Sequence, residues 1–73
     1  MEDVDAIITT VALETGVQRR FILGTSQAAR YTKARYLLIH RLKQAGYPVN
    51  EIARIVNRHH STVVYALQQD IAA

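Results

Sequence analysis

Apolar residues recur at helical spacing through most of the chain, and the breaks between these runs carry Gly, Pro, Ser or Thr. The first run predicts a helix that begins after Asp3 or Asp5, either of which can cap it with a carboxylate, and that ends near Glu14. Its apolar face is expected to consist of Val4, Ile7, Ile8 and Val11. Gly16 is the expected stop, because glycine adopts the left-handed conformation that ends many helices.

Residues 17–23 form a short apolar and basic stretch that predicts a single helical turn. Within it, we expect Phe21 and Ile22 to fill space in the core. We expect Arg19 and Arg20 on the surface, since arginine is almost never fully buried without a partner. This turn would connect the first helix to a longer one.

The longest run predicts a central helix over residues 27–45, which a hydroxyl of Thr25 or Ser26 would cap after the break at Gly24. Its apolar stripe, spaced by three and four positions, consists of Tyr31, Ala34, Leu38, Leu42 and Ala45. Such a stripe is typical of a helix around which other helices pack. Gly46 is expected to end it.

The last part of the chain predicts two helices joined by a tight turn. Residues 48–56 are amphipathic, and Pro48 suits the first helical turn, where its missing N–H is not needed. Asn57 and Arg58 can form the turn. The following helix starts with polar residues, and its inward positions are expected to be Val63, Ala66, Leu67 and Ile71. A DNA-recognition helix is built in this way, because its start enters the major groove while its body is anchored in a core.

Together these elements predict an all-α fold of four to five helices with a helix-turn-helix, in a single domain over residues 1–73. Hydrophobic residues make up 49% of the chain and charged residues 21%, which suffices for one small core and argues against disorder. A domain of this size buries only about 60% of its unfolded surface. A large cleft between domains is therefore not expected.

The charges are divided unevenly along the chain. The net charge is +3, yet Glu2, Asp3 and Asp5 crowd the start, and all nine Lys and Arg residues lie from Arg19 onward. A basic body suggests a polyanionic partner, although a solvated basic surface is the alternative. No apolar run approaches the length of a membrane span, and the acidic start is unlike a signal peptide. We therefore expect a cytoplasmic protein.

The sequence gives little evidence for a metal site or a catalytic site. The chain has no cysteine, which excludes disulfides, thiolate metal sites and cysteine nucleophiles. His59 and His60 are adjacent, but neighbours on a helix point about 100° apart, and His40 has no evident companion. Ser61 lies beside His60 without an orienting carboxylate nearby. We therefore expect no metal site, no catalytic residue, no enzyme activity and no cofactor.

Residues 58–66, Arg-His-His-Ser-Thr-Val-Val-Tyr-Ala, resemble a signature of the C-terminal DNA-binding domain of the bacterial replication initiator DnaA. In that family an Arg-Asp-His-Ser/Thr-Thr-Val run opens the recognition helix. Ala34 and Arg35 resemble the Ala-Arg pair that starts the family's central helix, and residues 51–53 resemble its Glu-Ile-Gly/Ala. The resemblance covers the chain from about Val4 onward. It implies a helical fold related to that of the Trp repressor and sequence-specific binding of duplex DNA.

The resemblance also implies a set of DNA contacts. Base edges in the major groove would be met by Arg58, His59, His60, Ser61 and Thr62. The DNA backbone or the minor groove would be met by Arg30, Lys33, Arg35, Lys43, Val49, Asn50 and Tyr65. Of these, Arg35 would sit on a phosphate and Arg30 near the minor groove, and the backbone N–H groups near Val49 would meet a phosphate at a helix N-terminus.

Three departures from the family pattern change what the resemblance implies. His59 replaces an aspartate that accepts a hydrogen bond from cytosine, so the DNA sequence that is recognised should differ. The stretch around residues 26–30 has fewer basic residues than is usual, which predicts weaker minor-groove contact. The chain contains no Gly-x-x-x-x-Gly-Lys-Ser/Thr phosphate loop, so no ATPase activity is expected from it.

Two function classes remain open. The first is a DNA-binding module, a stand-alone relative of the initiator domain that regulates replication or transcription at the nucleoid of a bacterial or phage-infected cell, with a phage-borne protein as one alternative. The second is a protein-interaction module that keeps the fold and binds a replication or transcription protein. The polar residues at the start of the last helix favour DNA, because an interaction surface would carry more apolar or acidic groups. The expected state is a monomer or a weak homodimer without membrane contact.

Overall fold

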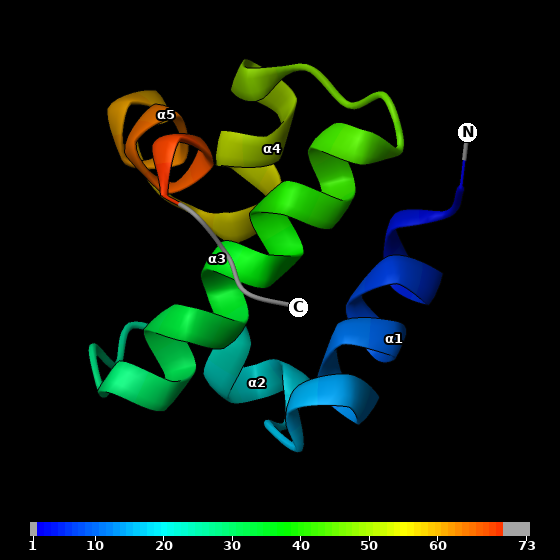
Figure 1. Ribbon diagram of the computed structural model, residues 1–73, viewed down its shortest axis with the longest axis vertical. Helices are drawn as coiled ribbons and strands as arrows, with labels where there is room; N and C mark the ends of the chain where they lie inside the picture. Colours follow the sequence, from blue (N-terminus) through cyan, green and yellow to red (C-terminus); the bar gives the residue numbers. More distant parts are fainter. Residues whose placement is uncertain (1, 70–73) are drawn as a thin grey trace.

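The computed structural model describes residues 2–69, which fold into five helices with no strand among them (Figure 1). The helices are α1 (Val4–Thr15), α2 (Arg19–Ile22), α3 (Ala29–Gln44), α4 (Val49–Val56) and α5 (His60–Gln68). The all-α prediction with a helix-turn-helix is thus confirmed. The expected inward position of Ile71 lies outside the described residues.

Helix α3 is the centre of the fold. It contacts each of the other four helices, with α1 and α2 on one side and α4 and α5 on the other, as Figure 1 shows. Of its predicted stripe, Ala34, Leu38 and Leu42 are buried, whereas Tyr31 and Ala45 pack at the edge of the core. The rest of the core comes from Ile7, Ile8, Val11, Val17, Ile22, Ile39, Ile52, Ala53, Val56, Val63 and Ala66.

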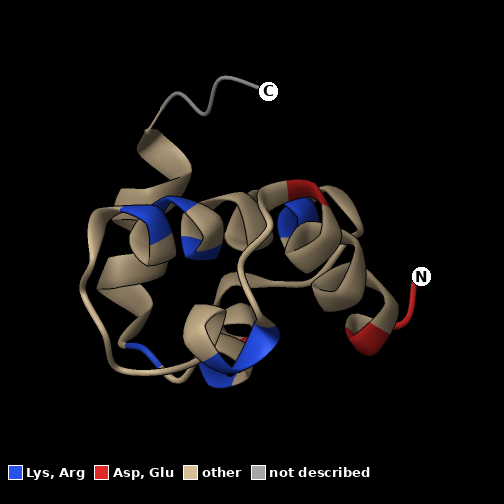
Figure 2. Cartoon of the chain, turned by 90° about the horizontal axis from the view of Figure 1, so that it is seen from below, with Lys and Arg blue, Asp and Glu red and all other residues tan. Residues whose placement is uncertain are grey.

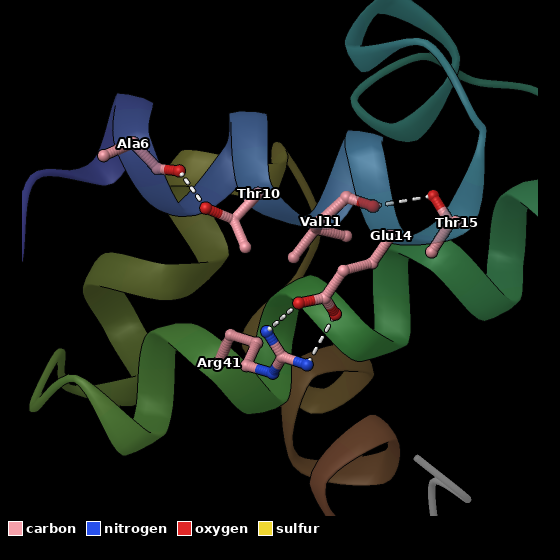
Figure 3. Close-up of polar contacts among 6 residues, drawn as sticks. All are labelled: Ala6, Thr10, Val11, Glu14, Thr15 and Arg41. Atoms are coloured by element: carbon pink, nitrogen blue, oxygen red, sulfur yellow. Dashed lines mark hydrogen bonds and ion pairs between the residues drawn. The ribbon is translucent and has the colours of Figure 1, made fainter.

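Helix α1 forms as its caps predict. The Asp3 carboxylate accepts a hydrogen bond from the Asp5 N–H at 3.4 Å, and Gly16 ends the helix with a φ of 70°. Within α1, the hydroxyl of Thr10 donates back to the carbonyl of Ala6 (Figure 3). Such bonds let threonine satisfy its hydroxyl within a helix. The same helix is joined to α3 by an ion pair between Glu14 and Arg41.

The start of α3 differs from the prediction. The helix begins at Ala29 rather than near residue 27, its N-cap is Ala28, and neither Thr25 nor Ser26 caps it with a hydroxyl. The Ser26 hydroxyl instead accepts from the Ala28 N–H at 3.3 Å, which stabilises the preceding turn. The reason is tertiary: the carbonyl oxygens of residues 24 and 26 accept hydrogen bonds from Arg35 of α3, and oxygens bonded in this way do not take part in a helix.

Helices α4 and α5 form the predicted helix-turn-helix. Pro48 is the N-cap of α4 and so precedes the first helical residue, rather than lying within the first turn as expected. Its carbonyl accepts from the N–H groups of Glu51 and Ile52 at 3.0 Å each. On α5, Val63 and Ala66 are fully buried and Leu67 is half-buried, as the pattern predicts. His40 of α3 donates from Nε2 to the carbonyl of Ala66 at 2.9 Å and thereby ties α5 to the central helix.

Candidate nucleic-acid interface

The turn between α4 and α5 is a closed unit of backbone hydrogen bonds. Asn57 adopts the left-handed conformation, with a φ of 54°. Asparagine is one of the few residues besides glycine that tolerate this conformation well. The Arg58 N–H then donates to the carbonyl of Ala53 at 2.9 Å, and the Asn57 N–H to that of Arg54 at 3.3 Å. These two bonds form the motif that commonly ends helices at a left-handed residue. The turn therefore orients the start of α5 rigidly relative to α4.

The first turn of α5 presents polar side chains to solvent. His59, His60 and Ser61 are exposed, and Thr62 is half-buried. The opposite side of the same helix is anchored by Val63 and Ala66, both without solvent exposure. The structure thus gathers four of the five predicted base-contacting residues, His59 to Thr62, at one helix end.

His59 has a structural role that the sequence did not predict. Its Nδ1 accepts a hydrogen bond from the Ser61 N–H at 3.2 Å and lies 2.8 Å from the Ser61 hydroxyl oxygen. His59 is therefore the N-cap of α5. Its ring also lies against that of His60, with centroids 4.3 Å apart. Both contacts restrict the direction in which the imidazole can point.

Arg35 is a buried residue rather than a surface one, and the phosphate contact expected of it stays a prediction. Its side chain is only 4% exposed. Its Nε donates to the carbonyl of Ile22 at 2.7 Å. Its Nη2 lies within hydrogen-bond distance of the carbonyls of Phe21, Gly24 and Ser26 at 3.4, 3.1 and 3.2 Å. A guanidinium used in this way holds the segment between α2 and α3.

Arg58 approaches the same segment from the helix-turn-helix. Its Nη2 donates to the carbonyl of Gly24 at 2.6 Å, and its Nη1 to the carbonyls of Val56 and Asn57 at 3.1 and 3.2 Å. Two guanidinium groups thus share the Gly24 oxygen. Burial lowers the pKa of Arg35 from its ordinary value, and the nearby charge of Arg58 lowers it further, although arginine stays protonated.

The Gly24 carbonyl therefore links the helix-turn-helix to the start of α3, a link that the sequence did not indicate. No side-chain pattern marks a backbone oxygen as the acceptor of two arginines. The base contact expected of Arg58 remains a prediction, because its half-buried side chain faces the protein here. The exposed polar set at the end of α5 accordingly begins at His59.

Two arginines frame an aromatic pair beside this segment. The rings of Phe21 and Tyr31 stack in parallel, with centroids 4.9 Å apart and an angle of 5°. The guanidinium of Arg20 lies 4.8 Å from the Phe21 centroid, and that of Arg30 lies 5.0 Å from the Tyr31 centroid. Cations over aromatic faces are attracted by the ring quadrupole. The stack keeps Arg20 and Arg30 at the surface near the start of α3.

The remaining expected backbone contacts lie at both ends of α3. Lys33 is exposed near its start, and Lys43 is exposed in its last turn, beside the start of α4. At that start, the first helical hydrogen bonds are donated by Glu51 and Ile52, so the N–H groups of Val49 and Asn50 precede them. Tyr65 is 54% exposed on α5, with its ring edge-on to Tyr36 at 6.3 Å.

The charge distribution separates this region from the N-terminal one. Figure 2 shows acidic positions at the N-terminal end of the chain, and basic positions elsewhere together with a few further acidic ones. The acidic start includes Glu2, Asp3 and Asp5, and Arg19 pairs with Asp5 at 2.6 Å. The electrostatic attraction for a polyanion is therefore concentrated away from the start of α1.

Within residues 2–69, no three His, Cys, Asp or Glu side chains are grouped to hold a metal ion. None of the helices described is long and apolar enough to cross a membrane. A hollow of about 160 Å³ lies between α1 and α3, lined by Glu2, Ile7, Thr10, Arg41, Gln44 and Ala45. Sites for small molecules usually have volumes of about 300–1,000 Å³. The helix-turn-helix is therefore the stronger candidate for a functional site.

Comparison with known proteins agrees with this geometry. Residues 4–69 match the family described as bacterial dnaA protein helix-turn-helix. The chain belongs to this family. It is 33% identical over 70 residues to the chromosomal replication initiator protein DnaA of Kosmotoga olearia, an alignment that covers 94% of this chain and 16% of that protein. No solved structure matches the chain.

Membership of the family confirms the resemblance noted in the sequence and implies DNA binding by the helix-turn-helix. In structural terms, this motif is α4, the turn at Asn57 and α5. The chain corresponds to a small part of the relative's length, so the activity of the whole relative is not carried over with the fold.

Proposed function

We propose that this domain recognises a specific sequence in double-stranded DNA by inserting the start of α5 into the major groove. The observation that carries the proposal is the exposed polar end of α5, His59 to Thr62, held by a closed turn and by the buried Val63 and Ala66. Hydroxyl and imidazole groups can bond to base edges, and the N-terminal end of a recognition helix is the part that reaches them.

Affinity in this proposal comes from phosphates and specificity from bases. Exposed cations such as Lys33 and Lys43 release counterions from the duplex, so binding weakens as salt rises. His60, Ser61 and Thr62 distinguish base pairs, each good contact contributing about 1–3 kcal/mol of discrimination. Arg30 contributes at the edge of the site, where the aromatic stack holds its guanidinium.

Selection of bound sequences from a random duplex pool, at low and moderate salt, tests the proposal. The wild-type domain is expected to enrich one motif, and Thr62→Ala to lose that enrichment while still binding DNA at low salt. Gln68→Ala is a matched control, because Gln68 is exposed at the far end of the same helix. Two outcomes would reject the proposal and favour a protein partner: no binding at all, or purely electrostatic binding that selects no motif and disappears as salt rises.

We further propose that such binding serves the control of replication or transcription. The relative's name, chromosomal replication initiator protein, supports the replication role. Mapping of the bound sites in the native cell separates the two roles: clustering at an origin supports replication control, and clustering at promoters supports transcriptional control. Sites scattered without relation to either would contradict a regulatory role.

A further inference from the structure

The cap on α5 determines which nitrogen of His59 carries its hydrogen. The Ser61 backbone N–H can only donate, and it points at His59 Nδ1 over 3.2 Å. Nδ1 must therefore be the acceptor and carries no hydrogen. In a neutral imidazole the other nitrogen is then the donor. The capped form of His59 presents Nε2–H.

The position of the ring directs this donor outward. Nε2 lies across the ring from Nδ1, so Nε2–H points away from the capped amide of Ser61. The His59 side chain is exposed, and the neighbouring His60 ring, 4.3 Å away, limits its rotation. The same side chain thus stabilises the helix start with one nitrogen and offers a hydrogen-bond donor at the helix end with the other.

We propose that His59 is a specificity-determining residue that reads a base through Nε2–H and discriminates against cytosine. Guanine, adenine and thymine each present an acceptor in the major groove, whereas cytosine presents only its N4 amino donor. Guanine is the best match, because its O6 and N7 acceptors lie side by side. This inference rests on the proposed function and adds the chemistry of one base position to it.

His59→Asp is the sharpest test, because aspartate is also a good N-cap but offers an acceptor instead of a donor. His59→Ser keeps a capping oxygen and removes the reach toward a base. Circular dichroism melting first establishes that all three proteins fold. Each then undergoes selection from a random duplex pool in the same mildly alkaline buffer.

The expected result is a change at one base position. The wild type should prefer an acceptor-bearing base there, guanine first, over cytosine by about fivefold to tenfold. His59→Asp should prefer cytosine, and His59→Ser should lose the preference, with the other positions unchanged. The inference is overturned if all three proteins select the same base throughout, or if the wild type selects cytosine at the position that His59→Asp changes. A failure of every protein to select any motif would instead reject the proposed function, and this inference with it.

Discussion

Two arginines of α3 are held in opposite ways. In the middle of the helix, Arg35 is 4% exposed and donates to backbone carbonyls of residues 21–26, with no carboxylate taking part. Toward its end, Arg41 is partly exposed and forms a bidentate pair with Glu14, at 3.1 and 2.6 Å (Figure 3). One charge is buried among dipoles, and the other is paired at the surface.

The comparison shows that an ion pair is not the stronger of the two arrangements. Exposed ion pairs contribute little, because water and salt screen them. The carbonyl of Ile22 is buried and those of Phe21 and Gly24 are half-buried, so these oxygens would lose a partner that water replaces poorly if the guanidinium were removed. The first arrangement holds together α2, α3 and, through Gly24, the turn before α5, whereas the second joins only α1 to α3. The region that positions the candidate site therefore depends on the buried arginine.

The largest effect is expected from Arg35→Met. This change removes the N–H donors to the carbonyls of residues 21, 22, 24 and 26. It should lower the free energy of unfolding by about 3–5 kcal/mol. A domain of this size is stable by only about 5–10 kcal/mol. Urea denaturation followed by circular dichroism measures the loss.

Arg35→Lys is the matched control, since it keeps the charge but offers fewer donors in a less suitable geometry. It should lie between the wild type and Arg35→Met in stability. Full stability of Arg35→Met would show that the buried arginine does not hold the fold and would remove the contrast with Arg41.

Gly24→Ala should have an intermediate effect in the same region. A Cβ at this position would lie 2.8 Å from the carbonyl oxygen of Arg20, so the segment must shift and with it the oxygen shared by Arg35 and Arg58. We expect a loss of about 1–3 kcal/mol in the free energy of unfolding. Thermal melting and a binding assay on the selected DNA motif measure the two consequences.

Gly16→Ala serves as a comparison for that substitution. Its added Cβ meets nothing within 4 Å, but its φ of +70° disfavours alanine. It should therefore destabilise α1 by about 1–2 kcal/mol without altering DNA binding. A Gly24→Ala protein with wild-type stability and DNA binding would show that the segment tolerates displacement.

The smallest effect is expected from Glu14→Gln, and it should depend on pH. The hydrogen bond from Arg41 lowers the pKa of Glu14 from its usual value. A carboxyl group with a lowered pKa stabilises the folded state above its unfolded pKa, and this contribution disappears as the pH falls through the lowered value. Wild type and variant should thus differ slightly in melting temperature near neutral pH and converge in acid. A difference that grows in acid would contradict this origin.

Local patterns predicted the turns of this protein well. Gly16, Gly46 and Asn57 lie at the helix ends where the sequence placed them, and all three adopt a positive φ. The apolar spacing also identified the central helix and the inward face of α5. These features depend on residues close in the chain, so a short stretch of sequence contains the information.

Arginines were the least predictable residues. Arg35 and Lys33 are both cations on α3, yet the first is buried and the second is exposed. The difference depends on carbonyl oxygens of residues 21–26, which become available only when α2 packs against α3. The start of α3 was mispredicted for the same reason, because these contacts keep the preceding residues out of the helix.

The order of helices, the two caps of α1, the end of α4 and the polar start of α5 were encoded locally, through helical periodicity and the conformational preferences of Asp3, Gly16 and Asn57. The direction in which each functional side chain points was not encoded locally. Whether a guanidinium points to solvent or to a carbonyl, and which nitrogen of His59 carries the hydrogen, depends on hydrogen bonds that form only when the backbone is folded. Hydrogen bonds act over about 3 Å, so they depend on where the folded chain brings each donor and acceptor together.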